Sequence, residues 1–245
     1  MSLEVTFSHP AFDAVRPFVE RIQAHGHFPT VAELDLLLRD RLSLYEPVAL
    51  ETQPPKRRRR GRRSRPRDSL YEGRIHVHRR VPTREENLHD LANALIWGAF
   101  PLAKRALVAR QYHALAARVP ELVDALPPTR TREQDALTML DEGGLILLAS
   151  TDCEDEVRSA LREEDVDTLR RWRRRGALSV LVFGHALLEH VALHSTDVRA
   201  FGMAVPRSAA DGDELACADR ALAAWIEAKR EGEAGGLSLR ALLEG

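Results

Sequence analysis

The sequence lacks several of the patterns that mark common classes of protein. No apolar run approaches the roughly 18 residues needed to span a bilayer. The first residues, MSLEVTFSHPAFD, do not combine a basic segment with a following apolar one, so no secretory signal is expected. The G-x-G-x-x-G, P-loop and G-x-S-x-G patterns are also missing, which removes the best sequence support for a nucleotide cofactor or for α/β-hydrolase chemistry.

Cysteine is scarce as well. The chain has two cysteines, Cys153 and Cys217, and they are too far apart in the sequence to form a close-spaced motif. This spacing does not make either of them a candidate zinc ligand. Two isolated cysteines without an export signal are typical of a reducing compartment, and we expect a cytoplasmic protein.

Acidic residues are absent from one basic segment. Residues 56–67, KRRRRGRRSRPR, contain Lys56 and eight arginines, and taking their +9 from the formal net charge of −1 leaves −10 for the rest of the chain. Four prolines, at positions 47, 54, 55 and 66, prevent this region from forming a packed core. We therefore expect a single domain over 1–245 that carries a basic flexible linker at about 47–68.

The basic linker has two interpretations. It binds nucleic acid or another polyanion by releasing condensed counterions, or it is a solubilising linker that folds back on the acidic body. No aromatic residue lies between the arginines, so the segment offers no surface on which bases stack. The first interpretation assigns nucleic-acid binding to Arg57, Arg58, Arg59, Arg60, Arg62 and Arg63.

The segment VPTREENLHDLANALIWGAFPLAK, residues 81–104, predicts a capped helix. Thr83 and Glu86 have the spacing of a capping box, which indicates a helix over about 84–100. At 3.6 residues per turn, His89, Asn93 and Trp97 lie on one face and Asp90 lies beside them. Because an indole is seldom left in water, we expect this polar face to be partly covered by another part of the chain.

A second segment, GALSVLVFGHALLEHVALH, predicts a buried helix over about 178–192, although its first half fits a strand equally well. His185 and Glu189 are four residues apart and share a helical face. Such a pair holds a metal ion or forms an oriented acid–base pair. The alternative is a core histidine whose hydrogen bonds are satisfied by a carbonyl or a carboxylate.

The whole pattern predicts a mostly helical α+β fold, with one small antiparallel β-hairpin and a short strand packed with several helices. The hairpin is expected within 136–149, with Asp141 in the turn between its strands, and the short strand at 71–80. A capping box at Thr30 and Glu33 predicts a helix that begins there. Further helices are expected over about 9–22, 102–119, 152–168, 213–229 and 237–244, with a loop over 202–212.

Residues in both central segments, and in the stretch before them, resemble the bacterial domain-of-unknown-function family DUF3025. The resemblance spans about residues 70–190, departs at Leu88, where an aromatic residue is expected, and implies no particular activity. The residues that carry it are Tyr71, Glu72, Arg74, Ile75, Val81, Pro82, Thr83, Arg84, Asn87, His89, Asp90, Asn93, Ala94, Leu95, Trp97, Phe100, Pro101, Lys104 and the run Phe183–Glu189.

Three hypotheses for function remain open. The first is a hydrolytic or metal-assisted site where the helix 84–100 meets the segment 178–192. In it His89 and His185 act as base or ligand, Asp90 and Glu189 orient them, and Asn93 positions the substrate. A divalent metal ion would be held by His89, His185 and Glu189. The second hypothesis is polyanion binding by residues 56–67, and the third is a structural or adaptor role in which the polar side chains only join helices.

Overall fold

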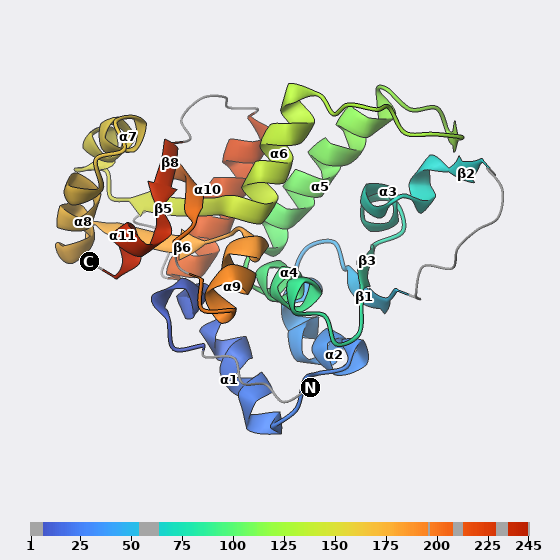
Figure 1. Ribbon diagram of the computed structural model, residues 1–245, viewed down its shortest axis with the longest axis horizontal. Coiled ribbons are helices and arrows are strands. Elements are labelled where there is room, and N and C mark those ends of the chain that lie inside the picture. Colours follow the sequence, from blue (N-terminus) through green and yellow to red (C-terminus); the bar gives the residue numbers. More distant parts are fainter. Residues whose placement is uncertain (1–6, 54–63, 196, 208–212, 229–234, 245) are drawn as a thin grey trace.

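The computed structural model describes residues 7–53, 64–195, 197–207, 213–228 and 235–244, and its fold is α+β and mostly helical (Figure 1). The helices are η1 Pro10–Val15, α1 Arg16–His25, α2 Val31–Leu42, η2 Arg67–Ser69, α3 Tyr71–His76, α4 Leu88–Ala99, α5 Pro101–Ala116, α6 Arg132–Gly143, α7 Glu154–Arg162, α8 Val166–Arg174, α9 His185–Ala192, α10 Glu214–Glu227 and α11 Leu239–Leu243. The strands are β1 Ala49–Thr52, β2 Arg65–Pro66, β3 Arg80–Thr83, β4 Leu122–Val123, β5 Gly144–Ala149, β6 Leu178–Val182, β7 Arg199–Pro206 and β8 Gly235–Ser238.

The main sheet has the strand order β6-β5-β7-β8. Strand β5 is parallel to β7 and antiparallel to β6, and β8 is antiparallel to β7. All six residues of β5, GLILLA, are buried. A strand covered on both faces is expected to have a continuous apolar sequence rather than an alternating one, and β5 has such a sequence.

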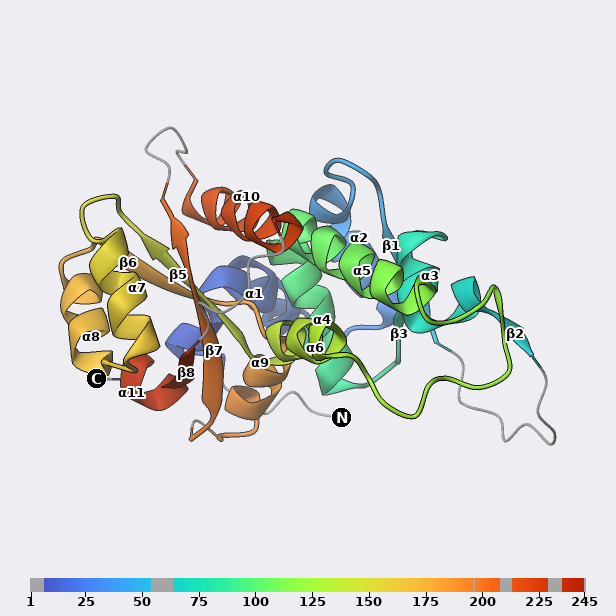
Figure 2. The same cartoon turned by 90° about the horizontal axis from the view of Figure 1, so that it is seen from above.

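Helix α4 lies near the middle of the molecule. In both views α7, α8 and α11 lie at one end, α3 and β2 at the other, and α4 between them (Figures 1 and 2). Residues 91–99 of α4 are all buried, and this helix packs against α2, α5 and α9. The face that carries Trp97 is therefore covered by other helices, as the sequence predicts.

The start of α5 is held by a carboxylate from a distant helix. The residue before α5, Phe100, provides no side-chain cap, but the buried Asp219 of α10 accepts hydrogen bonds from the backbone N–H groups of Leu102 (3.1 Å) and Ala103 (2.8 Å). Burial raises the pKa of Asp219 to about 6. These contacts fix α10 against α5.

The hairpin expected within 136–149 is not formed. Residues 132–143 are the helix α6, whose N-terminus is closed by a capping box of Thr131 and Gln134, and only residues 144–149 form a strand. This capping box was not predicted from the sequence, and it has Gln134 in place of the more common glutamate. Asp141 therefore lies in the last turn of a helix, where its side chain points into the protein rather than into a turn.

The region before α4 also differs from expectation. Tyr71–His76 is the helix α3 rather than a strand, and the nearby strand is β3, which pairs in parallel with β1 inside the range expected to be linker. Thr83 ends β3, and Asn87 caps α4 by accepting a hydrogen bond from the N–H of Asp90. The same residue pattern thus occurred at the end of a strand and did not mark the helix start.

Other elements agree more closely with the sequence. The box of Thr30 and Glu33 caps α2, and the apolar segment at 178 begins as a strand before α9 starts at His185. The loop expected over 202–212 is wrong for its first part, because residues 199–206 form β7. Among the residues that the structure describes, no helix is long and apolar enough to cross a membrane.

Candidate functional site

His89 of α4 and His185 of α9 meet at the contact between these two helices, which lie side by side in Figure 1. Their Nε2 atoms are 3.0 Å apart, and their ring planes are inclined by 77°. The two residues are separated by 96 positions in the sequence. The structure thus brings together the two histidines on which the proposed acid–base site depends.

Gly184 allows His185 to reach this position. A Cβ atom at residue 184 would lie 2.5 Å from the carbonyl oxygen of Glu142 and 2.5 Å from the amide nitrogen of Gly144. The Gly184 N–H donates a hydrogen bond to the Gly144 carbonyl at 2.8 Å. The first turn of α9 is therefore seated directly on the junction of α6 and β5, which is possible only without a side chain.

The remaining imidazole nitrogens have acceptors of their own. His185 Nδ1 lies 2.8 Å from the backbone carbonyl oxygen of Asp141, and His89 Nδ1 lies 2.8 Å from Glu189 Oε2. A carbonyl oxygen and an ionised carboxylate only accept hydrogen bonds, so both Nδ1 atoms carry a proton. With both Nδ1 positions protonated, a hydrogen bond between the two facing Nε2 atoms requires one further proton on one of the two rings.

Burial determines which ring is neutral. The His185 side chain is 6% exposed, and burial, together with the nearby charge of Lys104, lowers its pKa to about 4. The His89 side chain is 35% exposed and pairs with the carboxylate of Glu189, which is 30% exposed. His185 is therefore the neutral ring, which accepts in this contact, and His89 is the member of the pair that solvent reaches.

A buried ion pair lies behind His185. Lys104 is 1% exposed, and its ammonium group contacts the Asp141 carboxylate and donates to Asn93 Oδ1 at 2.8 Å. Burial by itself would raise the pKa of Asp141, but the charge of Lys104, the nearby histidines and the hydrogen bond from Lys104 together outweigh it and hold this pKa below its ordinary value. Asn93 Nδ2 in turn donates to the Tyr71 hydroxyl at 3.0 Å.

This network assigns different roles to the residues predicted from the sequence. Glu189 orients His89, rather than the histidine of its own helix. Asn93 bonds to Lys104 and Tyr71, and Asp90 bonds to the backbone N–H and guanidinium of Arg84. Asp90 thus holds the segment before α4.

Three residues of the network, Tyr71, Lys104 and Asp141, were not predicted as site residues. Lys104 was noted only as part of the family resemblance, and Asp141 was interpreted as an acid in a hairpin turn. The available signal for Lys104 was a single lysine among apolar residues of the predicted helix, because a lysine is almost never fully buried without a partner. Its partner is 37 residues away, and no local pattern identifies it.

The three predicted metal ligands do not converge on one point in this arrangement. Glu189 contacts Nδ1 of His89, whereas His185 contacts the opposite nitrogen, Nε2. Within the described ranges, no group of three or more His, Cys, Asp or Glu side chains is arranged to hold a metal ion. The arginines predicted to bind nucleic acid lie outside the described residues: Arg57, Arg58, Arg59, Arg60, Arg62 and Arg63.

Acidification is expected to destabilise the fold through His185. Its pKa is about 4 in the folded protein, against an ordinary value of 6.5, so between these values the unfolded chain binds a proton that the folded chain does not. The contribution of His185 to the free energy of unfolding is therefore fully present above this range and is lost as the pH falls through it. Between about pH 7.5 and about pH 4.5, we expect His185 to account for about 2 kcal/mol of the fall in the free energy of unfolding, measured by urea denaturation.

The variant His185→Gln isolates this effect. It has no imidazole to protonate, so its acid-side loss of stability should be smaller by that amount. His190→Gln, at an exposed position of the same helix, should retain the full loss. Equal losses in the wild-type protein and in His185→Gln would show that His185 is not buried in the neutral form.

Comparisons with known proteins give one match. The family model described as "Protein of unknown function (DUF3025)" matches residues 61–240, which include α4, α9 and every residue of the histidine network. No curated protein and no solved structure matches the chain.

Proposed function

The chain belongs to the DUF3025 family, and we propose that His89 and His185 form a general acid–base site of the hydrolytic type. The observation that carries the proposal is the 3.0 Å contact between the two Nε2 atoms, with each Nδ1 already bonded to an acceptor. A histidine pair whose only role was to join two helices would not need a ring that is exposed to solvent. His89 is about one third exposed.

Each residue of the pair has a distinct part in this proposal. His89 exchanges its proton with a substrate or with water. Glu189 keeps the ring in one orientation and stabilises the imidazolium form, in the way that a carboxylate supports the histidine of other acid–base sites. His185, fixed by the carbonyl of Asp141, holds the inner side of the His89 ring as a neutral acceptor. A positioned acid–base group of this kind contributes about 10²- to 10⁴-fold to a rate.

Metal-assisted hydrolysis is the alternative version of the same site. His89 and His185 would hold a divalent cation, which would activate a bound water, and the Nδ1 partners would act as the outer hydrogen bonds that usually orient metal-bound histidines. As a third ligand, Glu189 would first have to leave Nδ1 of His89. The predicted set of three metal ligands therefore does not fit the observed arrangement, and we base no catalytic step on a metal ion.

Hydrolysis of simple chromogenic substrates tests the proposal. We expect the purified chain to hydrolyse at least one of p-nitrophenyl acetate, p-nitrophenyl phosphate and bis(p-nitrophenyl) phosphate. His89→Gln is expected to lower kcat by about 100-fold because it removes the only solvent-exposed imidazole of the pair. His190→Gln, an exposed histidine on α9, is the matched control and should keep wild-type kcat.

The outcomes separate the acid–base version, the metal version and a structural role of the histidine network. Activity in metal-free protein that is lost in His89→Gln supports the acid–base version. Stoichiometric metal that is lost in His185→Ala supports the metal version instead. If no substrate is hydrolysed and the variants change only the free energy of unfolding, the network is structural and the hydrolytic proposal is wrong.

A further inference from the structure

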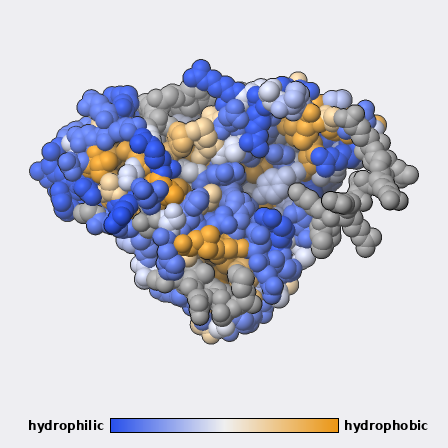
Figure 3. All heavy atoms as spheres, viewed as in Figure 1, coloured by the Kyte–Doolittle hydropathy of each residue, from blue (hydrophilic) through white to orange (hydrophobic). Residues whose placement is uncertain are grey.

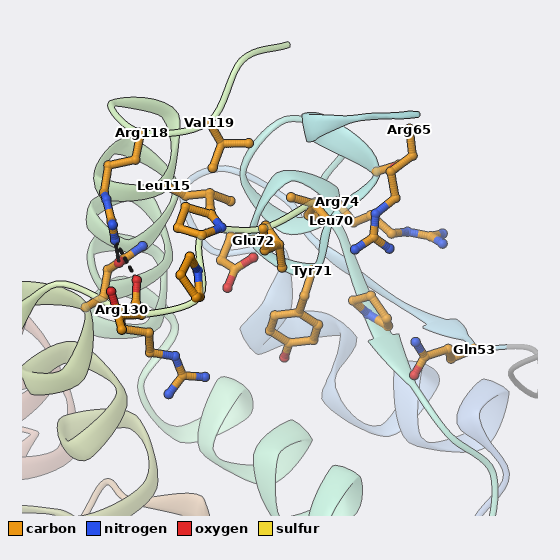
Figure 4. Close-up of a pocket in the computed structure, with 17 residues that line it drawn as sticks. Gln53, Arg65, Leu70, Tyr71, Glu72, Arg74, Leu115, Arg118, Val119 and Arg130 are labelled. Carbon is orange, nitrogen blue, oxygen red and sulfur yellow. Dashed lines mark hydrogen bonds between the residues drawn. The ribbon is translucent and has the colours of Figure 1, made fainter. Parts of the chain in front are cut away.

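A cleft of about 760 Å³ opens at the end of the molecule that carries α3, away from the histidine pair. It is bounded by the start of α3, the end of α5 and the segment that follows α5. Figure 4 shows the side chains that line it, with Arg118 and Arg130 on one side and Arg65 and Arg74 on the other. Ligand pockets of small molecules usually have volumes of about 300–1,000 Å³, so this cleft has the size of a small-molecule site.

The charges around the cleft are mostly positive. Its lining contains four arginines and a single carboxylate, that of Glu72. Arg74 is paired with Glu51, and Arg118 bonds to the carbonyl oxygen of Thr129. This leaves two guanidinium groups that have neither an ion-pair partner nor a hydrogen-bond acceptor among the described residues.

Those two groups belong to Arg65 and Arg130. Both side chains are exposed, and within the described part of the chain neither forms an ion pair or a hydrogen bond. Arg65 belongs to the basic segment 56–67, whereas Arg130 belongs to the acidic remainder of the chain, so the cleft brings cations from both parts to one concave surface. A guanidinium group without a partner can donate paired hydrogen bonds to a phosphate, and the cleft has one such group on each side (Figure 4).

The same cleft has an apolar wall. Leu70, Leu115 and Val119 form a small buried cluster at its base, and Leu126, which is 48% exposed, and Pro127 complete the wall. On the surface, hydrophobic residues lie among hydrophilic ones at this end of the molecule (Figure 3). The combination of cations and an apolar wall suits a ligand that has a flat, weakly polar part as well as a phosphate.

We propose that this cleft binds nucleotide phosphates, with Arg65 and Arg130 donating to phosphate oxygens from opposite sides of the cleft and the base placed against Leu126 and Pro127. The ligand is either a free nucleotide or one unit of a single strand, because both present the same phosphate and base. The proposal does not rest on the acid–base site. Tyr71 lines the cleft, but in Figure 4 its hydroxyl points away from the arginines, and it bonds to Asn93.

Fluorescence titration of the full chain tests this proposal. The probes are ADP carrying a fluorescent N-methylanthraniloyl group and a fluorescein-labelled single-stranded oligothymidylate, each at about 150 mM KCl to limit non-specific attraction. We expect at least one probe to bind, and Arg65→Gln and Arg130→Gln each to weaken it by roughly tenfold or more, because each removes a charge-assisted contact. Comparable binding of both probes indicates a free nucleotide, and preference for the oligonucleotide indicates a strand; either result supports the cleft.

A variant with the opposite expected effect on affinity serves as a control. Glu72→Gln removes the one carboxylate of the lining and is expected to tighten binding by a few fold. Arg174→Gln and Asp155→Asn change exposed residues on α8 and α7, at the other end of the molecule, and should leave the affinity unchanged (Figure 1). An effect confined to the cleft distinguishes a built site from a change in net charge.

Three results would overturn the proposal. The first is that neither probe binds. The second is that Arg65→Gln and Arg130→Gln bind as tightly as Arg174→Gln. The third is that binding disappears when the arginines at 57–60, 62 and 63 are replaced by glutamine but is untouched in both cleft variants. His89→Gln should bind the probes normally, so failure of the hydrolytic proposal and failure of this one are separate outcomes.

Discussion

Lys104→Ala is expected to lower the free energy of unfolding by about 3–5 kcal/mol, the usual result of breaking a buried ion pair from one side. The substitution leaves the Asp141 carboxylate, whose side chain is only 15% exposed, without its cation. It also removes the donor to Asn93 Oδ1 and opens space next to the rings of Trp97 and Phe183, which lie 5.6 Å and 6.0 Å from the Lys104 ammonium. Urea denaturation at neutral pH measures the loss.

Two further variants check the cause. Lys104→Ala combined with Asp141→Asn should recover part of the stability, since the amide is neutral and no buried charge is left unpaired. Arg39→Ala breaks an ion pair with Asp35 on the surface of α2, where the Arg39 side chain is 60% exposed, and should change stability by less than about 1 kcal/mol. A loss below about 1 kcal/mol in Lys104→Ala would mean that Asp141 reaches solvent and that the ion pair is not buried.

Gly184→Ala is expected to have the second largest effect on stability. The new methyl group would overlap the backbone at Glu142 and Gly144, with contacts of 2.5 Å that no side-chain movement relieves. We expect α9 to shift away from α6, with a loss of about 3 kcal/mol, the upper part of the range for overpacked sites. Because His185 is the first residue of α9, the same shift should separate it from His89 and abolish the activity that depends on the pair.

Gly143→Ala is the matched control for this variant. Gly143 ends α6 only one residue before β5, but a Cβ atom there would have an ordinary contact, 3.7 Å from the Phe201 ring. Its stability and activity should remain close to those of the wild-type protein. If Gly184→Ala were as stable and active as Gly143→Ala, the seating of α9 on the backbone of α6 and β5 would not be what positions His185.

The sequence predicted the parts of this fold that depend on local interactions. The capping box of Thr30 and Glu33 requires only neighbouring residues, and it marked the start of α2 correctly. The burial of Trp97 followed from the mismatch between a large indole and a polar helix face. The same local logic failed at Thr83 and Glu86, because an identical pattern closes a strand when its neighbours pair with β1.

Partnerships across the chain were much less predictable. His185 and Glu189 share a helix face, so they were expected to act on each other, yet Glu189 bonds to His89 and His185 bonds to the backbone of Asp141. Which partner a side chain meets depends on how α9 packs on α4 and α6, and that packing is set by the main sheet and by Gly184. Asp141 was predicted to lie in a hairpin turn, because the segment before β5 was not predicted to be a helix.

The proposed acid–base site depends on one hydrogen bond between two imidazoles from distant segments, those of His89 and His185. Nitrogen NMR of the full chain labelled with ¹⁵N-histidine tests it most directly, because protonated and unprotonated ring nitrogens have well-separated shifts. We predict that near neutral pH His185 is protonated at Nδ1 only, and that a coupling across the hydrogen bond connects the two Nε2 atoms. A His185 ring protonated at Nε2 instead, or the absence of this coupling, would contradict the hydrogen bond between the two rings, and with it the proposed acid–base site.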